Sequence, residues 1–114
     1  MKLTRVNPVE LRRHGVAFIK ELEELEDELE KLLEKHGYRI AYHYELESLS
    51  IDEEDVELIE REMGRKPLLT IPLVKTKEPH DGLYRAIVLE DSEVVLVRTR
   101  LTNKGVEKDI IRLE

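Results

Sequence analysis

The clearest pattern in the sequence is a run of apolar residues spaced for a long helix. They recur at intervals of four, three, four and three, at Phe18, Leu22, Leu25, Leu29 and Leu32. This spacing places them in one narrow seam of an α-helix. Asn7 and Pro8 are typical of a helix start, and Gly37 is typical of a helix end. The sequence therefore predicts one helix over residues 7–36.

Two further elements follow this helix. Apolar and polar residues alternate over residues 38–46, which predicts a strand with one buried face. Ser50 and Glu53 then form a capping box, a pair that satisfies backbone N–H groups at the start of a helix. Gly64 supplies the stop, so the pattern predicts a second, shorter helix over residues 51–63.

The remainder of the chain predicts a β-meander over residues 68–113. Four extended runs are separated by polar turns, among them Asp91-Ser92 and Asn103-Lys104-Gly105. Pro72 lacks a ladder donor, which favours an edge strand or a bulge for the first run. The predicted fold class is α+β: an antiparallel sheet of about five strands, packed by one long N-terminal helix and one short helix. We expect residues 1–114 to form a single domain.

Two of the predicted strands are apolar on both faces. Neither residues 83–89 nor residues 94–97 alternate with polar positions, so both faces of the sheet need cover. Either the two helices take opposite faces, or a second copy of the chain covers one of them. A helix over residues 7–36 also exceeds the usual ~11–12 residues, which favours a partner helix. We therefore predict a homodimer, with the interface at Phe18, Leu22, Leu25, Leu29 and Leu32.

Composition excludes several classes of site. The 114 residues include no cysteine, which excludes disulfides, Cys-ligated zinc, iron–sulfur clusters and thiol nucleophiles. No apolar run approaches 18 residues and no signal peptide opens the chain, so we expect a cytoplasmic protein without membrane contact. Charged residues make up 39% of the chain, a proportion that favours a thermophilic source, although some mesophilic helical proteins share it.

Charge is distributed unevenly along the chain. Residues 1–60 carry 8 Lys and Arg against 17 Asp and Glu, whereas residues 61–114 carry 11 against 9. An acidic block surrounds the leucine seam and predicts either a docking face for a basic protein partner or a solvated helix face. Its members are Glu21, Glu23, Glu24, Glu26, Asp27, Glu28 and Glu30.

One basic group is a candidate anion-binding or nucleic-acid-binding site. Arg98 and Arg100 share a face of one predicted strand, and Arg85 lies on the neighbouring strand. Guanidinium forks suit phosphate or carboxylate groups. The alternative is a cross-strand lattice of ion pairs with Glu107, Asp109 or Glu90, which would leave little charge for a ligand.

Two acidic groups are weaker candidates for metal chemistry. His43, Glu45 and Glu47 alternate on one strand and could seed a metal site, although the same spacing is typical of a water-facing strand. Asp81 and Glu90, separated by an apolar strand, resemble the magnesium-binding pattern of some nucleases. The chain departs from that pattern because Ser92 stands where the pattern has lysine.

The sequence contains no phosphate-cradling glycine loop and no nucleophile turn, and it implies no cofactor. We therefore predict a non-enzymatic, self-associating interaction or regulatory module that presents an acidic helix to a partner. One alternative is a nucleic-acid-binding module that uses a basic face of the C-terminal sheet. The other is a metal-dependent hydrolase acting through Asp81 and Glu90.

Overall fold

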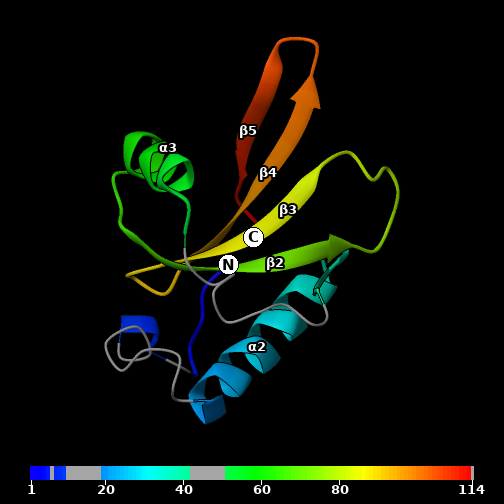
Figure 1. The fold of residues 1–114 in the computed structure, drawn as a ribbon. Helices are drawn as coiled ribbons and strands as arrows, with labels where there is room; N and C mark the ends of the chain where they lie inside the picture. Colours follow the sequence, from blue (N-terminus) through cyan, green and yellow to red (C-terminus); the bar gives the residue numbers. More distant parts are fainter. Residues whose placement is uncertain (6, 10–18, 42–50, 114) are drawn as a thin grey trace.

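A computed structural model describes residues 1–5, 7–9, 19–41 and 51–113. In it two helices lie on opposite sides of a five-stranded antiparallel sheet (Figure 1). The predicted α+β class is therefore confirmed. The described elements, in chain order, are α2 (Ile19–Glu34), β1 (Tyr38–Ile40), α3 (Glu53–Met63), β2 (Pro67–Lys75), β3 (Leu83–Leu89), β4 (Val94–Thr102) and β5 (Gly105–Ile111).

The predicted long helix is described at its start and over its second half. Pro8 and Val9 are helical, and the Val9 amide donates to Asn7 Oδ1 at 3.0 Å, as expected for an asparagine cap. Residues 10–18 lie outside the described part of the chain. The helix ends at Glu34 rather than at residue 36, because the backbone tightens into a turn in which Gly37 has φ 83°.

The short helix begins two residues later than predicted. Asp52 is the N-cap residue in an extended conformation, and its side chain makes no capping hydrogen bond. Its carbonyl oxygen instead accepts from the amides of Asp55 and Val56, each at 3.0 Å. The predicted capping residue Ser50 lies outside the described residues. The predicted end is correct: Gly64 adopts a left-handed conformation and its amide donates to the Glu60 carbonyl.

The sheet is a meander, as predicted, with strands in the order of the sequence. Pro72 lies on β2, which is not the outermost strand because β1 pairs beyond it. The Pro72 carbonyl accepts from Ala41, just past the end of the three-residue β1. The N–H and C=O groups of a strand residue point to the same side. The N–H that Pro72 lacks would therefore point toward the place where β1 ends. Of the predicted strand over residues 38–46, residues 42–46 lie outside the described part.

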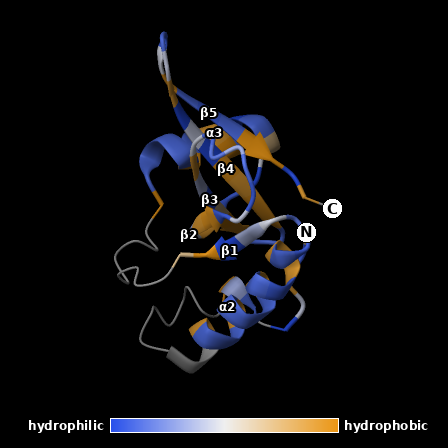
Figure 2. Cartoon of the chain, turned by 90° about the vertical axis from the view of Figure 1, so that its right-hand side faces the viewer, coloured by the Kyte–Doolittle hydropathy of each residue, from blue (hydrophilic) through white to orange (hydrophobic). Residues whose placement is uncertain are grey.

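The two helices cover opposite faces of the sheet (Figures 1 and 2). Leucines of α2 pack on one face, against residues such as Ile71, Ala86 and Leu96. Ile59 of α3 packs on the other face, against Ile87, Leu89, Val95 and Val97. The strands that are apolar on both faces are thus covered within one chain. A second copy of the chain is therefore not required to cover these strands.

The first residues of the chain lie beside the β3–β4 turn, a contact that the sequence did not predict. The Leu3 amide donates to the Ser92 carbonyl at 2.9 Å, and the Val94 amide donates to the Met1 carbonyl at 2.8 Å. The Leu3 side chain is buried in the core under α2. The amino group of Met1 also donates to the carbonyl of Leu113, so both ends of the described chain are held at this place.

Candidate functional site

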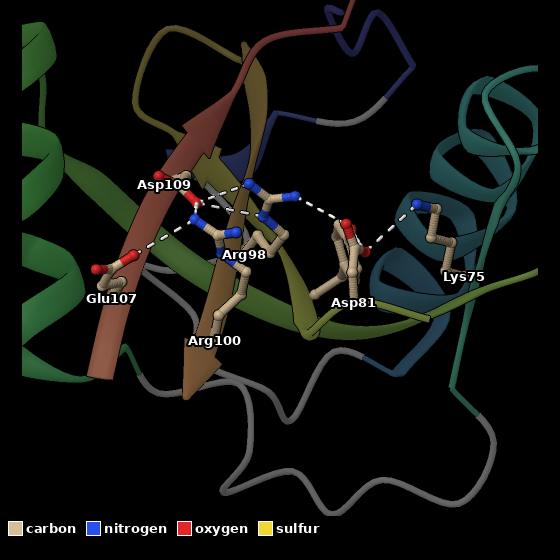
Figure 3. A network of polar contacts seen from close by, with 7 residues as sticks. Lys75, Asp81, Arg98, Arg100, Glu107 and Asp109 are labelled. Atoms are coloured by element: carbon tan, nitrogen blue, oxygen red, sulfur yellow. Dashed lines mark hydrogen bonds and ion pairs between the residues drawn. The ribbon is translucent and has the colours of Figure 1, made fainter. Parts of the chain in front are cut away.

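Two of the three candidate arginines lie at the centre of a polar network on the α2 face of the sheet (Figure 3). Arg98 and Arg100 are two residues apart on β4 and therefore project to the same side. Arg98 donates to Asp109 Oδ2 from Nη2 and to Asp81 Oδ2 from Nη1, each at 2.9 Å. Arg100 Nη2 lies 3.4 Å from both Glu107 Oε2 and Asp109 Oδ2. The ion-pair lattice expected as the alternative to an anion site is present.

Asp81 connects this network to β2 and β3. The Tyr84 hydroxyl donates to Asp81 Oδ1, and Lys75 Nζ lies 3.4 Å from the same oxygen. These contacts, first of all the hydrogen bond from Tyr84, lower the pKa of Asp81 from 3.8 to about 2. The neighbouring Gly82 permits the close approach of the loop to β4, because an added Cβ would lie 2.7 Å from the Thr99 carbonyl oxygen.

Arg85 does not join the other two arginines. It pairs with Val97 across the β3–β4 ladder, so its side chain lies on the α3 face, opposite Arg98 and Arg100. There its Nε donates to Thr70 Oγ1 at 3.0 Å. The prediction of one basic group of three arginines is therefore wrong, because a shift of one residue in register reverses the face of every side chain.

The network carries no surplus positive charge. Its three cations, Lys75, Arg98 and Arg100, face the three carboxylates of Asp81, Glu107 and Asp109. The Nε atom of Arg100 is buried without a hydrogen-bond partner, so it does not add an exposed donor. A phosphate group would have to displace these ion pairs, which argues against nucleic-acid binding at this place.

The acidic candidates for metal chemistry do not assemble in the described part of the chain. Asp81 precedes and Glu90 follows β3, whose seven residues span about 20 Å at 3.3 Å per residue. They are too distant to hold one magnesium ion. His43, Glu45 and Glu47 lie outside the described residues. No group of three or more His, Asp or Glu side chains that could hold a metal is found among the residues described.

The leucine seam lies in the core of the chain itself. Leu22, Leu25 and Leu29 are buried against the sheet, and Leu32 is partly buried beside them. Phe18 lies outside the described residues. The predicted partner helix is therefore not needed at this seam, because the chain's own sheet occupies the place. The same 3–4 spacing arises when a helix packs on a sheet as when it packs on another helix.

The acidic block around the seam is not uniformly solvated. Glu28 is only 7% exposed, and its carboxylate accepts hydrogen bonds from the amides of Thr4 and Arg5 at 3.0–3.1 Å. Asp27 forms ion pairs with Arg5 and Lys31. Glu28 thus anchors the first residues of the chain and is not available to a basic partner.

A surface that the sequence did not predict lies on the α3 face, at the end of the sheet that includes the β4–β5 hairpin. Four large apolar side chains are exposed there: Val74 (38%), Leu83 (74%), Leu101 (84%) and Val106 (64%). Leu101 lies opposite Val106, and Leu83 lies opposite Thr99, the next residue along the same face as Leu101. Such neighbours are about 5–8 Å apart, so the four residues form one apolar strip across β2 to β5.

The strands carry no carboxylates on the face of the apolar strip, although helix α3 on that face is acidic. By the strand register, the residues of β2 to β5 on the α3 face include no Asp or Glu. The sequence did not predict the strip because the apolar signal is strongest in the middle of each strand, whereas Leu101 and Val106 flank a polar turn. The sequence signal for Leu101 and Val106 is their spacing of two along each strand, which places both side chains on an apolar face.

Replacing Tyr84 with phenylalanine is expected to raise the pKa of Asp81 from about 2 toward its ordinary value of 3.8. The variant keeps the aromatic ring at position 84, whose centroid lies 5.2 Å from that of the Tyr38 ring. It loses the hydrogen bond to the Asp81 carboxylate. Since Asp81 has a lowered pKa when folded, its stabilising effect is present above pH 3.8 and disappears as the pH falls toward 2. The variant should therefore lose this contribution at a higher pH.

Titration of the Asp81 carboxyl carbon by NMR measures this shift directly. Tyr38→Phe is the matched control, because it removes a neighbouring hydroxyl that does not donate to Asp81 among the described contacts. An unchanged pKa of Asp81 in Tyr84→Phe would contradict the assignment of Tyr84 as the main cause.

The helices among the described residues include none long and apolar enough to span a bilayer. Comparison with known proteins adds no family: no family model, curated protein or solved structure matches the chain.

Proposed function

We propose that the chain is a non-enzymatic, cytoplasmic protein-interaction module that self-associates through the apolar strip. The observation that carries this proposal is the exposure of Leu83, Leu101 and Val106 side by side on a regular sheet. Contiguous apolar surface of this kind typically marks an interaction site. The dimer interface proposed here is the exposed apolar strip. It replaces the leucine seam predicted from the sequence, which is buried within the chain.

A second copy of the chain is the partner that fits the strip best. The net charge of −7 makes two copies repel each other over most of their surface. The strip is the place where strand carboxylates are missing, so two strips can meet with the least repulsion. Facing strips would form an isologous interface, in which each copy contributes the same residues.

The size of the strip agrees with the core of a modest interface. A buried Val or Leu removes about 60–120 Å² of apolar surface, so four partly exposed side chains supply on the order of 200–300 Å² per copy. A standard interface buries about 800 Å² per partner, of which the rim is polar. Thr99 lies within the strip, between Leu83 and Leu101, and Arg85 and Lys108 flank it on the same face.

Replacing Leu101 with glutamate is expected to weaken the dimer at least tenfold. The change removes a side chain whose burial is worth about 1.5–3 kcal/mol and places a carboxylate against its symmetry mate. Sedimentation equilibrium between about 1 and 100 µM, a range that brackets typical weak dimers, measures the dissociation constant. Circular dichroism should show an unchanged fold, since Leu101 is 84% exposed.

The matched control is Val9→Glu, which places the same charge on an exposed apolar residue outside the strip. It should dimerise like the unmodified chain. A chain that sediments as a monomer over the whole range would overturn the proposal, as would equal weakening by both variants.

A further inference from the structure

Helix α3 begins directly beside the apolar strip. Leu83 of the strip lies opposite Thr99, and Thr99 lies opposite Lys108 on β5. Lys108 Nζ contacts two carboxylates at the start of α3, Asp55 Oδ1 at 2.6 Å and Glu54 Oε2 at 3.9 Å. The start of the helix therefore borders the strip on the β5 side.

From this point α3 runs away from the turn between β4 and β5. Leu58 and Met63, further along the helix, pack in the same apolar cluster as Ile110, further along β5. The helix thus covers the part of the sheet beyond the strip. The end of the β4–β5 hairpin, with Leu101 and Val106, extends past the helix in the other direction (Figure 1).

The height of α3 above the sheet limits how two apolar strips can meet. Stacked sheets lie about 10 Å apart, whereas an α-helix with its side chains is about 10–12 Å in diameter. A partner sheet in contact with the strip therefore occupies the same level above the sheet as α3. The two copies avoid overlap when only their hairpin ends face each other and the two hairpins point in opposite directions.

Opposed hairpins bring two opposite charges together. The turn of each hairpin then points toward the start of α3 in the other copy. Lys104 is exposed in that turn, and Glu53 is exposed as the first residue of α3. Neither side chain forms an ion pair within the part of the chain that the structure describes. A single copy thus leaves unused a cation and an anion that the opposed arrangement places side by side.

We propose that the second copy docks on the apolar strip with its β4–β5 hairpin antiparallel, so that Lys104 of each copy pairs with Glu53 of the other. This inference rests on the proposed dimer and adds its arrangement and its polar contacts. Because the interface is isologous, it contains the pair twice. The two pairs close the hairpin ends of the interface, while the strip forms its apolar centre.

Exchange of the two charges between variants tests the pair. In a dimer of Lys104→Glu both contacts become repulsive, whereas a mixed dimer of Lys104→Glu with Glu53→Lys again holds opposite charges at both contacts. The matched control mixture contains Glu60→Lys, which makes the same change at an exposed residue further along α3. Sedimentation equilibrium with a fluorescent label on the Lys104→Glu variant measures both mixtures.

The mixture with Glu53→Lys should associate several-fold more tightly than the mixture with Glu60→Lys, although the net charges of the two mixtures are equal. Equal association of the two mixtures would overturn the antiparallel arrangement and leave the proposed dimer standing. If the unmodified chain remains a monomer, the proposed dimer and this arrangement both fail.

A spin label at the turn locates the partner directly, because the chain contains no cysteine of its own. A nitroxide is attached at Lys104→Cys, and this variant is mixed with the isotope-labelled unmodified chain. Only amides that the label approaches in the other copy are then broadened. Broadening should be strongest at the start of α3, around Glu53. Strongest broadening at Asn103, in the turn itself, would mean that the hairpins point in the same direction and would overturn the proposal.

Discussion

Replacing Lys108 with methionine should lower the free energy of unfolding by about 3–5 kcal/mol, the usual cost of leaving a buried charge without its partner. Asp55 at the start of α3 is only 2% exposed, and its Oδ1 accepts from Lys108 Nζ at 2.6 Å. Methionine keeps most of the side-chain volume but supplies no positive charge. Urea denaturation followed by circular dichroism measures the loss as a shift in midpoint at constant slope.

Lys104→Met provides the control for this change, because Lys104 lies exposed in the turn between β4 and β5. A surface substitution of this kind changes stability by about 0.5 kcal/mol or less. The double variant Asp55→Leu/Lys108→Met should recover most of the loss, since both members of the pair are then apolar. Equal stability of the two single lysine variants would mean that the carboxylate of Asp55 does not need Lys108.

Truncating Ile59 to alanine should cost about 2–5 kcal/mol, the range observed for large-to-small changes in cores. Ile59 is the fully buried apolar residue of α3 and packs among Ile87, Leu89, Val95 and Val97. A cavity at this position removes the contacts that the Ile59 side chain makes between α3 and the sheet. The measurement is the same denaturation experiment, with hydrogen exchange of α3 amides as a second readout of whether the helix leaves the sheet.

A graded series tests the cause of the Ile59 effect. Ile59→Val removes a single methylene group and should cost about 0.5–1.5 kcal/mol. If alanine costs no more than valine, the helix is not held by this side chain. The effects of Ile59→Ala and Lys108→Met should also combine non-additively, because each weakens the attachment of the same helix.

The periodicity of the sequence predicted the regular elements well but not the partners of their faces. The alternation and turn residues after residue 68 indicate a meander because hairpin pairing is local. The leucine seam indicates a helix with one buried stripe, yet it does not say whether a sheet or a second helix buries it. That choice depends on contacts between α2 and strands β2 to β4, which begin more than 30 residues after the helix ends.

The candidate sites were harder to predict than the fold. Arg85 and Arg98 lie on opposite faces because Val88 pairs with Val94 around the β3–β4 turn, and composition does not reveal that register. Glu28 is indistinguishable in sequence from the carboxylates around it. Its burial follows from the return of Thr4 and Arg5 to α2, across 24 and 23 residues.

The meander also has a consequence for the route by which the chain folds. Each strand from β2 to β5 pairs with its neighbours in sequence, so each ladder closes a short loop at a small entropic cost. The Lys2–Glu93 bridge, by contrast, joins residues about 90 positions apart. The entropic cost of closing so long a loop is offset more easily when the C-terminal strands are already folded. We therefore expect the C-terminal half to be the template on which the amino-terminal residues settle last.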